Sequence, residues 1–198
     1  MSYLSPKDFE SILNTVNILP ISSLTPEDIS QYSFDCGKAI EYVTFLKEKA
    51  LGLENLGITR TFLLIHNGTG ELIGYYSLSA DTVRLTIDEK VGTNLETVDF
   101  MSLPAVKLGK LAINKKLSKE AQRKGYGSFI LDIVNTYAYE MLNNGVACRF
   151  ITVDADIEYY PDTPEFYIKN GFVVNQFRKR KATDKTVSMR RDIFSEDP

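Results

Sequence analysis

The sequence predicts a mixed α/β fold, because segments with strand periodicity and segments with helical periodicity alternate along its 198 residues. Three observations support this prediction. Residues 106–113 form an apolar run of strand length. Residues 127–141, shortly after it, repeat apolar side chains at helical spacing. Residues 59–66 and 72–79 are apolar runs joined by Asn67-Gly68-Thr69-Gly70, which is typical of a hairpin.

The composition is that of an ordinary soluble globular chain, with 43% hydrophobic and 25% charged residues. The length suits one domain with a good core, or one domain plus an extension. We expect an N-terminal helical extension at residues 1–33, packed on a domain at residues 34–198. The net charge of −3 gives no global basic field that would favour nucleic acid or membranes. No signal peptide or apolar run of transmembrane length is visible, so we expect a cytoplasmic protein without a membrane partner.

Cysteine and histidine are too sparse to predict a metal site. Cys36 and Cys148 lie far apart and match neither a metal-binding nor a disulfide spacing, so we expect two reduced, partly buried thiols. The single histidine, His66, ends an apolar run and has no companion ligand nearby in the sequence. We therefore expect no metal cofactor.

From the N-terminus, the first expected elements are helices. We expect a helix from Lys7 to Val16 after Ser5-Pro6, and a short helical turn opened by Thr25-Pro26. A longer helix is expected from residue 40 to about residue 50, closed near Gly52. Residues 80–104 are ambiguous, since residues 83–87 fit a strand extension and residues 94–101 fit a loop.

Beyond the central helix, which Gly145 is expected to end, the alternation continues. The expected elements are a strand at 148–153, an acidic loop at 154–162, a helix at 164–170, a strand at 172–174 and a last strand at 186–189.

The turn between the strand at 106–113 and the central helix has the chemistry of a phosphate-binding loop. Gly125 and Gly127 lack the Cβ atoms that would keep a pyrophosphate from the backbone, and a helix N-terminus presents unpaired N–H groups. Between residues 107 and 127 only Glu120 opposes seven basic residues: Lys107, Lys110, Lys115, Lys116, Lys119, Arg123 and Lys124. A glycine-capped surface turn is the alternative for this motif taken alone.

The residues Gln122-Arg123-Lys124-Gly125-Tyr126-Gly127 match in full the Gln/Arg-x-x-Gly-x-Gly/Ala loop with which GNAT acetyltransferases hold the pyrophosphate of acetyl-CoA. Some forty residues on, Phe166-Tyr167-Ile168-Lys169-Asn170-Gly171-Phe172 is similar to the family's Phe-Tyr-x-x-x-Gly-Phe segment. The resemblance covers about residues 59–172. It implies a single GNAT domain, with a mixed, mostly antiparallel, twisted sheet, helices on both faces and splayed central strands.

The resemblance also implies an N-acetyltransferase that uses acetyl-CoA as cosubstrate and transfers acetyl to a primary amine by direct attack. Main-chain groups of Leu111, Ala112 and Ile113 would hold pantetheine, and one of their N–H groups would polarise the thioester. The cofactor-binding residues implied in the loop are Gln122, Arg123, Lys124, Gly125, Tyr126, Gly127 and Ser128. A Gly125→Glu substitution is expected to weaken acetyl-CoA binding and to leave the fold intact.

Tyr167 matches the family's general acid, which protonates the departing thiolate. A phenol with a pKa of about 10 keeps its proton at neutral pH. The alternative is that Tyr167 packs its ring in the core, for which Phe166 and Phe172 are the better candidates because they have no polar tip. Residues Asp154, Asp156 and Glu158 form an acidic loop near the expected acceptor entrance, in which no general base is assigned.

A subgroup resemblance adds a specific acceptor. Phe34-Asp35-Cys36-Gly37, residues 59–62 and residues 73–78 look like the GNAT toxins of toxin–antitoxin pairs, which acetylate the amino group of aminoacyl-tRNA. Residues Lys115, Lys116, Lys119 and the run Arg178-Lys179-Arg180-Lys181 could form the basic surface that tRNA requires. Alternatively, these charges serve CoA phosphates and solubility. The acidic total, the N-terminal segment and residues 80–104 depart from a compact basic toxin.

Two classes of function therefore stay open. The first is an acetyltransferase, acting on a small amine, a protein amine or charged tRNA; in the toxin case an antitoxin protein is implied as a partner, and a homodimer stays open. The second is a non-catalytic acetyl-CoA-binding module on the same fold. Tyr167 together with the intact loop favours the enzyme.

Overall fold

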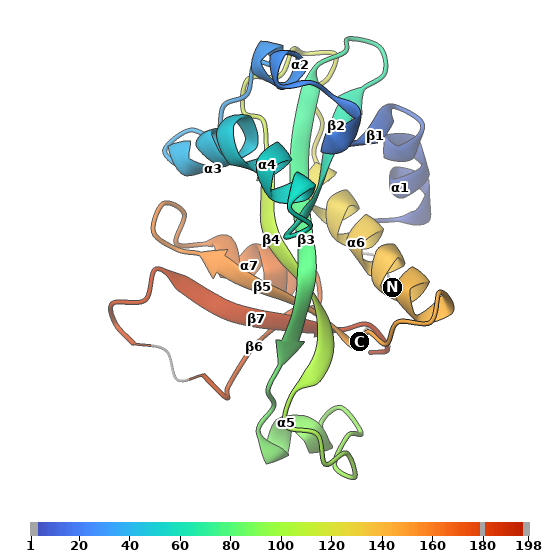
Figure 1. Ribbon diagram of the computed structural model, residues 1–198, viewed down its shortest axis with the longest axis vertical. Coiled ribbons are helices and arrows are strands. Elements are labelled where there is room, and N and C mark those ends of the chain that lie inside the picture. The colour runs from blue at the N-terminus through green and yellow to red at the C-terminus, as the bar shows by residue number, and fades with distance from the viewer. Residues whose placement is uncertain (1–3, 179–180, 196–198) are drawn as a thin grey trace. The chain divides into compact units, whose positions relative to one another are not determined.

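The protein, seen in a computed structural model, is described over residues 4–178 and 181–195. These residues form two compact units, an N-terminal unit of residues 4–79 and 109–130 and a C-terminal unit of residues 80–108 and 131–195. Three elements, labelled in Figure 1, have residues in both units: β3 (Leu72–Val83), β4 (Leu103–Ile113) and α6 (Tyr126–Asn143). The grouping follows spatial contacts and not chain order, so the sequence-based division at residue 33 stays a prediction.

The predicted mixed α/β fold is confirmed. Within the described residues, seven strands pair in the order β1-β2-β3-β4-β5-β7-β6. The antiparallel pairs are β1–β2, β2–β3, β5–β7 and β6–β7. The pair β4–β5 is parallel. Antiparallel pairing therefore predominates among these pairs, as the resemblance implied.

The N-terminal unit opens with α1 (Pro6–Leu13), β1 (Val16–Pro20), a 3₁₀ turn (Ile21–Ser23), α2 (Pro26–Gln31), α3 (Ile40–Thr44), a π-helical turn (Phe45–Lys49), α4 (Ala50–Asn55) and β2 (Arg60–His66). The hydroxyls of Ser5 and Thr25 begin α1 and α2 by accepting backbone N–H groups at 3.1 and 3.2 Å. Both predicted helix starts are thus correct.

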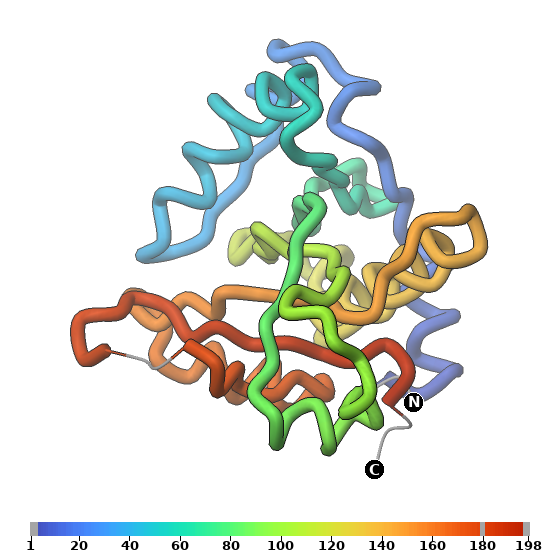
Figure 2. Tube along the Cα trace, turned by 60° about the horizontal axis from the view of Figure 1, so that its bottom comes forward, coloured from blue at the N-terminus to red at the C-terminus, as the bar shows by residue number. Residues whose placement is uncertain are grey.

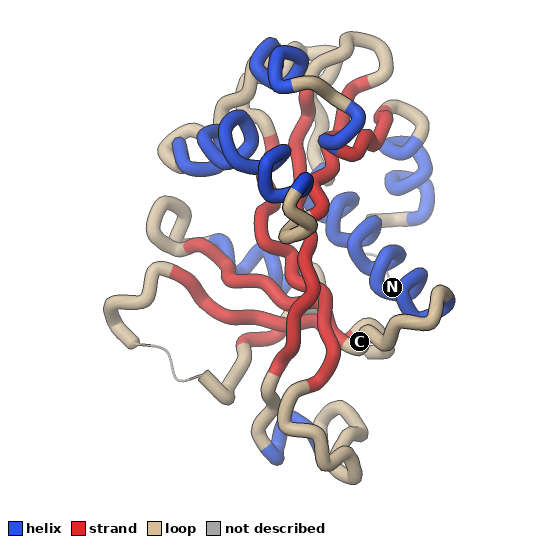
Figure 3. Tube along the Cα trace, viewed as in Figure 1, coloured by secondary structure: helices blue, strands red, loops and turns tan. Residues whose placement is uncertain are grey.

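Two details of this unit differ from the sequence prediction. Val16 does not extend α1, because it begins β1, which pairs with β2 from Val16↔His66 to Pro20↔Phe62. The prediction that Gly52 closes the helix that begins at residue 40 is wrong. The helix continues to Asn55, and Gly57, with φ 70°, follows its end. Figure 3 shows the helices of the described chain in blue and its strands in red. A glycine inside a helix costs only about 1 kcal/mol, which packing readily offsets.

The C-terminal unit adds α5 (Ile87–Val91), β5 (Phe150–Asp156), α7 (Thr163–Lys169), β6 (Val173–Val174) and β7 (Thr186–Asp192). The ambiguous residues leave the end of β3, form α5 and a loop, and return as β4 (Figure 2). The expected strand extension at residues 83–87 is therefore wrong beyond Val83. Thr86 caps α5 instead, since its hydroxyl accepts the Glu89 N–H and the Glu89 carboxylate accepts the Thr86 N–H.

A small apolar cluster and a buried ion pair hold α5 and its loop on the C-terminal unit. The cluster contains Val83, Leu85, Leu103, Ala105 and Phe150, with Leu95 and Val98 packed against it. The buried carboxylate of Glu89 accepts a hydrogen bond from the buried Arg190 guanidinium at 2.6 Å. The segment thus covers apolar surface at one end of this unit's strands.

The parallel pairing of β4 with β5 is short. It runs from Ala105↔Phe150 to Leu108↔Val153, although β4 continues to Ile113 and β5 to Asp156. Along its other edge, β5 pairs with β7 over its full length, from Phe150 to Asp156. The pairing of β4 with β5 therefore ends at Leu108, which is also the last residue of β4 in the C-terminal unit. No helix in the described part of the chain has the length and apolar character needed to cross a membrane.

Candidate active site

The predicted cofactor loop lies entirely in the N-terminal unit, at the start of α6. Gly125 has φ 98°, a conformation that glycine adopts without strain. The first helical hydrogen bond runs from the Phe129 N–H to the Gly125 carbonyl at 2.9 Å. The N–H groups of Tyr126, Gly127 and Ser128 precede this bond and have no partner within the helix. The loop therefore ends in three backbone donors at the positive end of an 18-residue helix.

Side chains inside the loop hold its shape. The buried Tyr126 hydroxyl donates to the Ala121 carbonyl at 2.9 Å, and burial raises the pKa of this phenol. Ser118 donates its N–H and its hydroxyl to Glu71, and these bonds lower the pKa of that carboxylate. The Tyr126 side chain is thus a support of the loop, and only its backbone N–H is left for a ligand.

Helix α1 contacts the loop directly. The Arg123 guanidinium donates to the Ser11 hydroxyl at 2.8 Å and lies 3.5 Å from the Asp8 carboxylate. The rings of Phe9 and Phe129 lie 5.0 Å apart. Arg123, which the resemblance places among the cofactor-binding residues, therefore already has protein partners in this structure.

The side-chain direction at Gly125 changes one expectation. A Cβ there would lie 3.0 Å from Leu4 Cδ2 and 3.6 Å from Ile12 Cδ1. A side chain at Gly125 would thus point into the packing with α1, at a φ that other residues rarely adopt. Gly125→Glu is therefore expected to lower the stability of the protein as well as its affinity for acetyl-CoA.

Of the seven basic residues around the loop, several are neutralised by neighbours. Lys110 lies 3.5 Å from the Glu41 carboxylate and 4.5 Å from the Tyr42 ring centroid, and Lys116 lies 3.0 Å from the Asp35 carboxylate. Lys119 and Lys124 are exposed and form no ion pair with any residue in the described ranges. These two lysines are the positive charges most available to an anion at the loop. Of the predicted basic run, Lys179 and Arg180 lie outside the described residues.

The proposed pantetheine strand, Leu111 to Ile113, is the last part of β4 and belongs to the same unit as the loop. Asn114 N–H donates to the Ile73 carbonyl at 2.8 Å, and the Ala112 carbonyl also faces β3, next to Gly74. Successive strand residues direct their backbone groups to opposite edges. The groups of Leu111 and Ile113 thus point away from β3, and the pairing with β5 has already ended at Leu108. These two residues, and not Ala112, carry the open backbone edge.

Tyr167 lies on α7 in the C-terminal unit and is only 6% exposed. Its ring contacts those of Phe166 and Phe172, with centroids 5.1 and 5.3 Å away. Phe166 is only half-buried, so the expectation that Phe166 is a better core residue than Tyr167 is wrong; Phe172 is fully buried, as expected.

The end of α7 fixes the position of Tyr167. Gly171 has φ 79°, its N–H donates to the Ile168 carbonyl at 3.0 Å, and the Phe172 N–H donates to the Tyr167 carbonyl at 3.0 Å. These two bonds and the Tyr167–Phe172 ring contact make a Schellman motif. The spacing from Phe166 to Phe172 that resembles the family motif is therefore a helix-ending device, which holds the tyrosine in one place.

The three carboxylates of the expected acidic loop, two of which lie in β5, each already have a hydrogen-bond or ion-pair partner. The carboxylate of Asp154 accepts from Lys107 at 2.6 Å, that of Glu158 accepts from Lys185 at 2.6 Å, and that of Asp156 accepts the Glu158 N–H at 2.9 Å. The base stays unassigned. Cys36 and Cys148 are buried, and burial raises both thiol pKa values, that of Cys36 to about 11, so neither is a ready nucleophile at neutral pH.

Sequence reasoning missed Asn114, which ties the base of the loop to two other segments, residues 33–35 and the start of β3. Its buried amide donates to the carbonyls of Ser33 at 2.8 Å and Leu72 at 2.9 Å, and accepts the N–H groups of Asp35 at 3.1 Å and Lys116 at 3.0 Å. Asn114 stands directly after the strand, where a polar residue is ordinary. Its sequence position therefore carries no signal for this role.

A scan against protein-family models finds no match for this sequence. Solved structures do match. A tyrosine-to-phenylalanine variant of KacT is 23% identical, with a TM-score of 0.63 over 88% of this chain and 94% of that chain. A structure described as a bacterial toxin is 21% identical, with a TM-score of 0.68 over 90% of each chain. AtaT complexed with acetyl-methionyl-tRNAfMet is 20% identical, with a TM-score of 0.61 over 87% of this chain and 93% of that chain.

At these identities the similarity is one of fold. The matched structures cover 87–90% of this chain. This chain therefore has the GNAT fold, in a form that it shares with KacT and the toxin AtaT.

Proposed function

We propose that this chain is an acetyl-CoA-dependent N-acetyltransferase of the toxin type, which acetylates the amino group of an aminoacyl-tRNA. The observation that carries the proposal is the pair of open backbone donor sets in the N-terminal unit, one at the start of α6 and one on the β4 edge. The acceptor is suggested by the fold shared with AtaT, which has been solved with acetyl-methionyl-tRNAfMet and, together with AtaR, with acetyl-CoA.

The residues present fit acetyl-CoA. The N–H groups of Gly127 and Ser128, with Lys124 beside them, would hold a pyrophosphate, because backbone donors and helix charge both favour an anion there. The open edge at Leu111 and Ile113 would accept amide groups of pantetheine as a neighbouring strand does. When bound, acetyl-CoA supplies an acetyl thioester that a neutral amine can attack.

In the transfer itself, the amine nitrogen bonds to the acetyl carbon, the carbon–sulfur bond breaks, and the nitrogen gives up one proton to water. A backbone N–H of Leu111 or Ile113 would donate to the carbonyl oxygen as negative charge develops on it. Tyr167 would give its phenolic proton to the leaving sulfur, since a phenol is protonated at neutral pH. Matched structures of KacT and of AtaT were each solved with one tyrosine replaced by phenylalanine.

The direct test is an acceptor screen with radiolabelled acetyl-CoA. We expect label to enter charged tRNA and not the same tRNA after mild base has removed the amino acid. If label entered small amines but no charged tRNA, the protein would be an acetyltransferase, and aminoacyl-tRNA would not be its acceptor. If the protein bound acetyl-CoA but transferred label to no acceptor, it would be a non-catalytic acetyl-CoA-binding module.

A cellular experiment separates the toxin role from other acetyltransferase roles. Induced expression of the wild-type chain should arrest growth, and Tyr167→Phe, expressed to the same level, should relieve the arrest. Normal growth with abundant wild-type protein would contradict the toxin role.

A further inference from the structure

The C-terminal unit contains an open polar pocket of about 160 Å³ that none of the proposed cofactor or catalytic residues lines. Its walls come from the end of β3, from β4, β5 and β7, and from the segment after β6. The side chains that matter for its chemistry are Asp81, Arg84, Lys107, Phe177, Arg178 and Ser188.

The charges that line the pocket are mainly positive. Arg84 and Arg178 form no ion pair with any residue in the part of the chain that the structure describes. Lys107 is paired with Asp154 at 2.6 Å, and the Asp81 carboxylate accepts a hydrogen bond from the Thr152 hydroxyl. Among the described residues, the pocket lining thus contains two guanidinium groups without an ion-pair partner and one carboxylate that is already hydrogen-bonded.

Arg84 is held in an orientation that suits anion binding. The central carbon of its guanidinium lies over the Phe177 ring, 5.3 Å from the centroid. A guanidinium over an aromatic ring keeps the N–H groups at its rim free, and these match the oxygens of a phosphate in bidentate fashion. Phe177 is 43% exposed, so part of its ring also remains open to a ligand.

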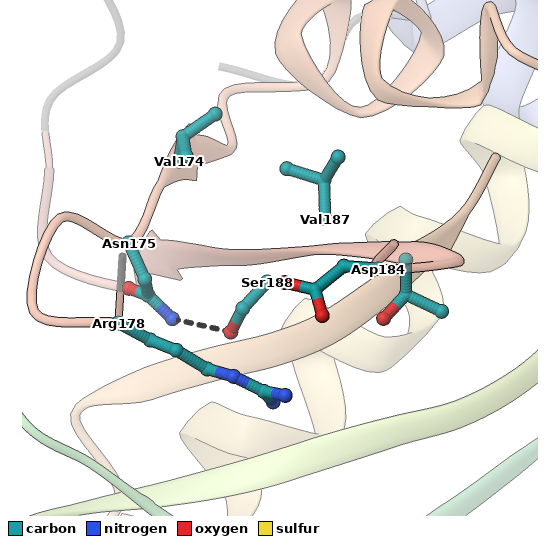
Figure 4. Close-up of a pocket in the computed structure, with 7 residues that line it drawn as sticks. Val174, Asn175, Arg178, Asp184, Val187 and Ser188 are labelled. Atoms are coloured by element: carbon teal, nitrogen blue, oxygen red, sulfur yellow. Dashed lines mark hydrogen bonds between the residues drawn. The ribbon is translucent and has the colours of Figure 1, made fainter. Parts of the chain in front are cut away.

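A third donor lies on β7. The Ser188 hydroxyl oxygen accepts a hydrogen bond from the Asn175 side-chain amide at 3.0 Å, drawn as a dashed line in Figure 4. The amide is fixed, because the carbonyl oxygen of Asn175 accepts from the buried Arg190 at 2.9 Å. The Ser188 hydroxyl proton is thereby left to donate. Arg178 extends past this pair in Figure 4.

We propose that this pocket binds the phosphate group of a nucleotide, with the base stacked on the open part of the Phe177 ring. Guanidinium and hydroxyl donors are the groups that recognise phosphate, and aromatic rings stack nucleobases whatever their sequence. The volume is below the 300–1,000 Å³ of a site that encloses a whole ligand, so the site takes one phosphate and leaves the base at the rim. The source is a free mononucleotide or the backbone of an RNA. The proposal does not depend on acetyl transfer.

The test is calorimetric titration of the full chain with three probes: inorganic phosphate, cytidine monophosphate and the tetranucleotide CCCC. Each titration is run with saturating acetyl-CoA, so that the loop at α6 is not the site measured. In Arg84→Gln/Arg178→Gln we expect affinity for cytidine monophosphate to fall by at least about tenfold, the usual effect of removing charge-assisted bonds. Phe177→Leu should weaken cytidine monophosphate binding and leave phosphate binding unchanged.

Lys169→Gln is the matched control, because Lys169 is an exposed cation of the same unit and does not line the pocket. It should change each affinity less than about twofold. Tighter binding of the tetranucleotide than of the mononucleotide, lost in the double variant, supports the RNA source, and equal binding supports a free nucleotide. Equal affinities in wild type and a folded double variant, or no binding of any probe by wild type, would overturn the proposal. Both the comparison of wild type with the double variant and the comparison of the probes measure binding, so neither depends on acetyl transfer.

Discussion

The carbonyl oxygen of Ala112 lies 2.5 Å from the point that a Cβ on Gly74 would occupy. Both positions belong to the N-terminal unit, where β3 passes the last residues of β4. Since the obstructing atom belongs to the backbone, no side-chain rotation can relieve the clash. Gly74 thus allows β3 to lie this close to the proposed pantetheine strand.

Gly74→Ala should therefore destabilise the protein by about 1–3 kcal/mol, the usual cost of overpacking. It should also weaken acetyl-CoA binding, because β4 must shift at Ala112. Urea unfolding and calorimetry measure the two effects. Gly109→Ala is the stability control, since its Cβ would meet only the Ser77 carbonyl at an ordinary 3.7 Å. Equal stabilities of the two variants would contradict this account.

Lys124→Glu should weaken acetyl-CoA binding without loss of stability, because Lys124 is exposed at the loop and has no ion-pair partner among the described residues. Arg123→Gln should lower stability and leave acetyl-CoA affinity nearly unchanged. It removes the bond to Ser11 and should lower stability by about 0.5–1.5 kcal/mol. Calorimetry at low and high salt, paired with thermal unfolding, separates the two. A loss of affinity in Arg123→Gln alone would place the phosphate at Arg123.

Tyr167→Phe should lower turnover by about 10²–10⁴, the usual contribution of general acid catalysis, with stability and acetyl-CoA affinity nearly unchanged. The expected reason is loss of a proton with almost no loss of volume. Tyr126→Phe is a matched control, because it removes a hydroxyl that bonds the Ala121 carbonyl inside the loop. That control should lose about 1 kcal/mol of stability and retain the chemical step. Normal turnover in Tyr167→Phe would show that this tyrosine only packs.

Stability should fall at acidic pH through Glu89. Burial disfavours the charged form, but the N–H groups of Thr86 and Gln176 and the charge of Arg190 outweigh it and lower the pKa of Glu89. Because the pKa of Glu89 is lower in the folded state than in the unfolded state, its charge stabilises the folded protein above the unfolded pKa, about 4.3. This contribution is lost as the pH falls through the folded pKa. Urea unfolding between pH 7 and pH 3 should show this loss.

Glu89→Gln tests the same pair by mutation. It leaves the buried Arg190 without its counter-charge and should destabilise the protein by about 3–5 kcal/mol at pH 7. Because the titrating group is gone, the variant should also lose less stability than wild type between pH 7 and pH 3. An unchanged pH profile would show that another carboxylate governs acid unfolding.

Local patterns predicted most of the fold. The starts of α1 and α2, the β2–β3 hairpin and the turn before α6 each depend on residues within a few positions of one another. The loop's glycines and the Phe166–Phe172 spacing are local in the same sense, which is why the residues of the candidate site could be named from the sequence.

Contacts between distant residues could not be predicted. Arg123 bonds Ser11 across 112 positions, and Arg190 bonds Glu89 across 101. No period or cap in the sequence encodes such a pairing, so Arg123 was assigned to the cofactor and residues 83–87 to a strand. Strand β1 was missed because its five residues end in Leu19-Pro20, which signals a chain break more strongly than a strand.

The packing of α1 on the loop has a practical consequence. The side chain of Leu4 reaches the space beside Gly125, so the first turn of the described chain touches the residue that opens α6. An affinity tag or fusion partner joined ahead of Leu4 would add its bulk next to the proposed acetyl-CoA loop. Binding constants from such a fusion would report the tag as well as the protein. Purification handles for this protein therefore belong at the other end of the chain, or must be cleaved before any titration.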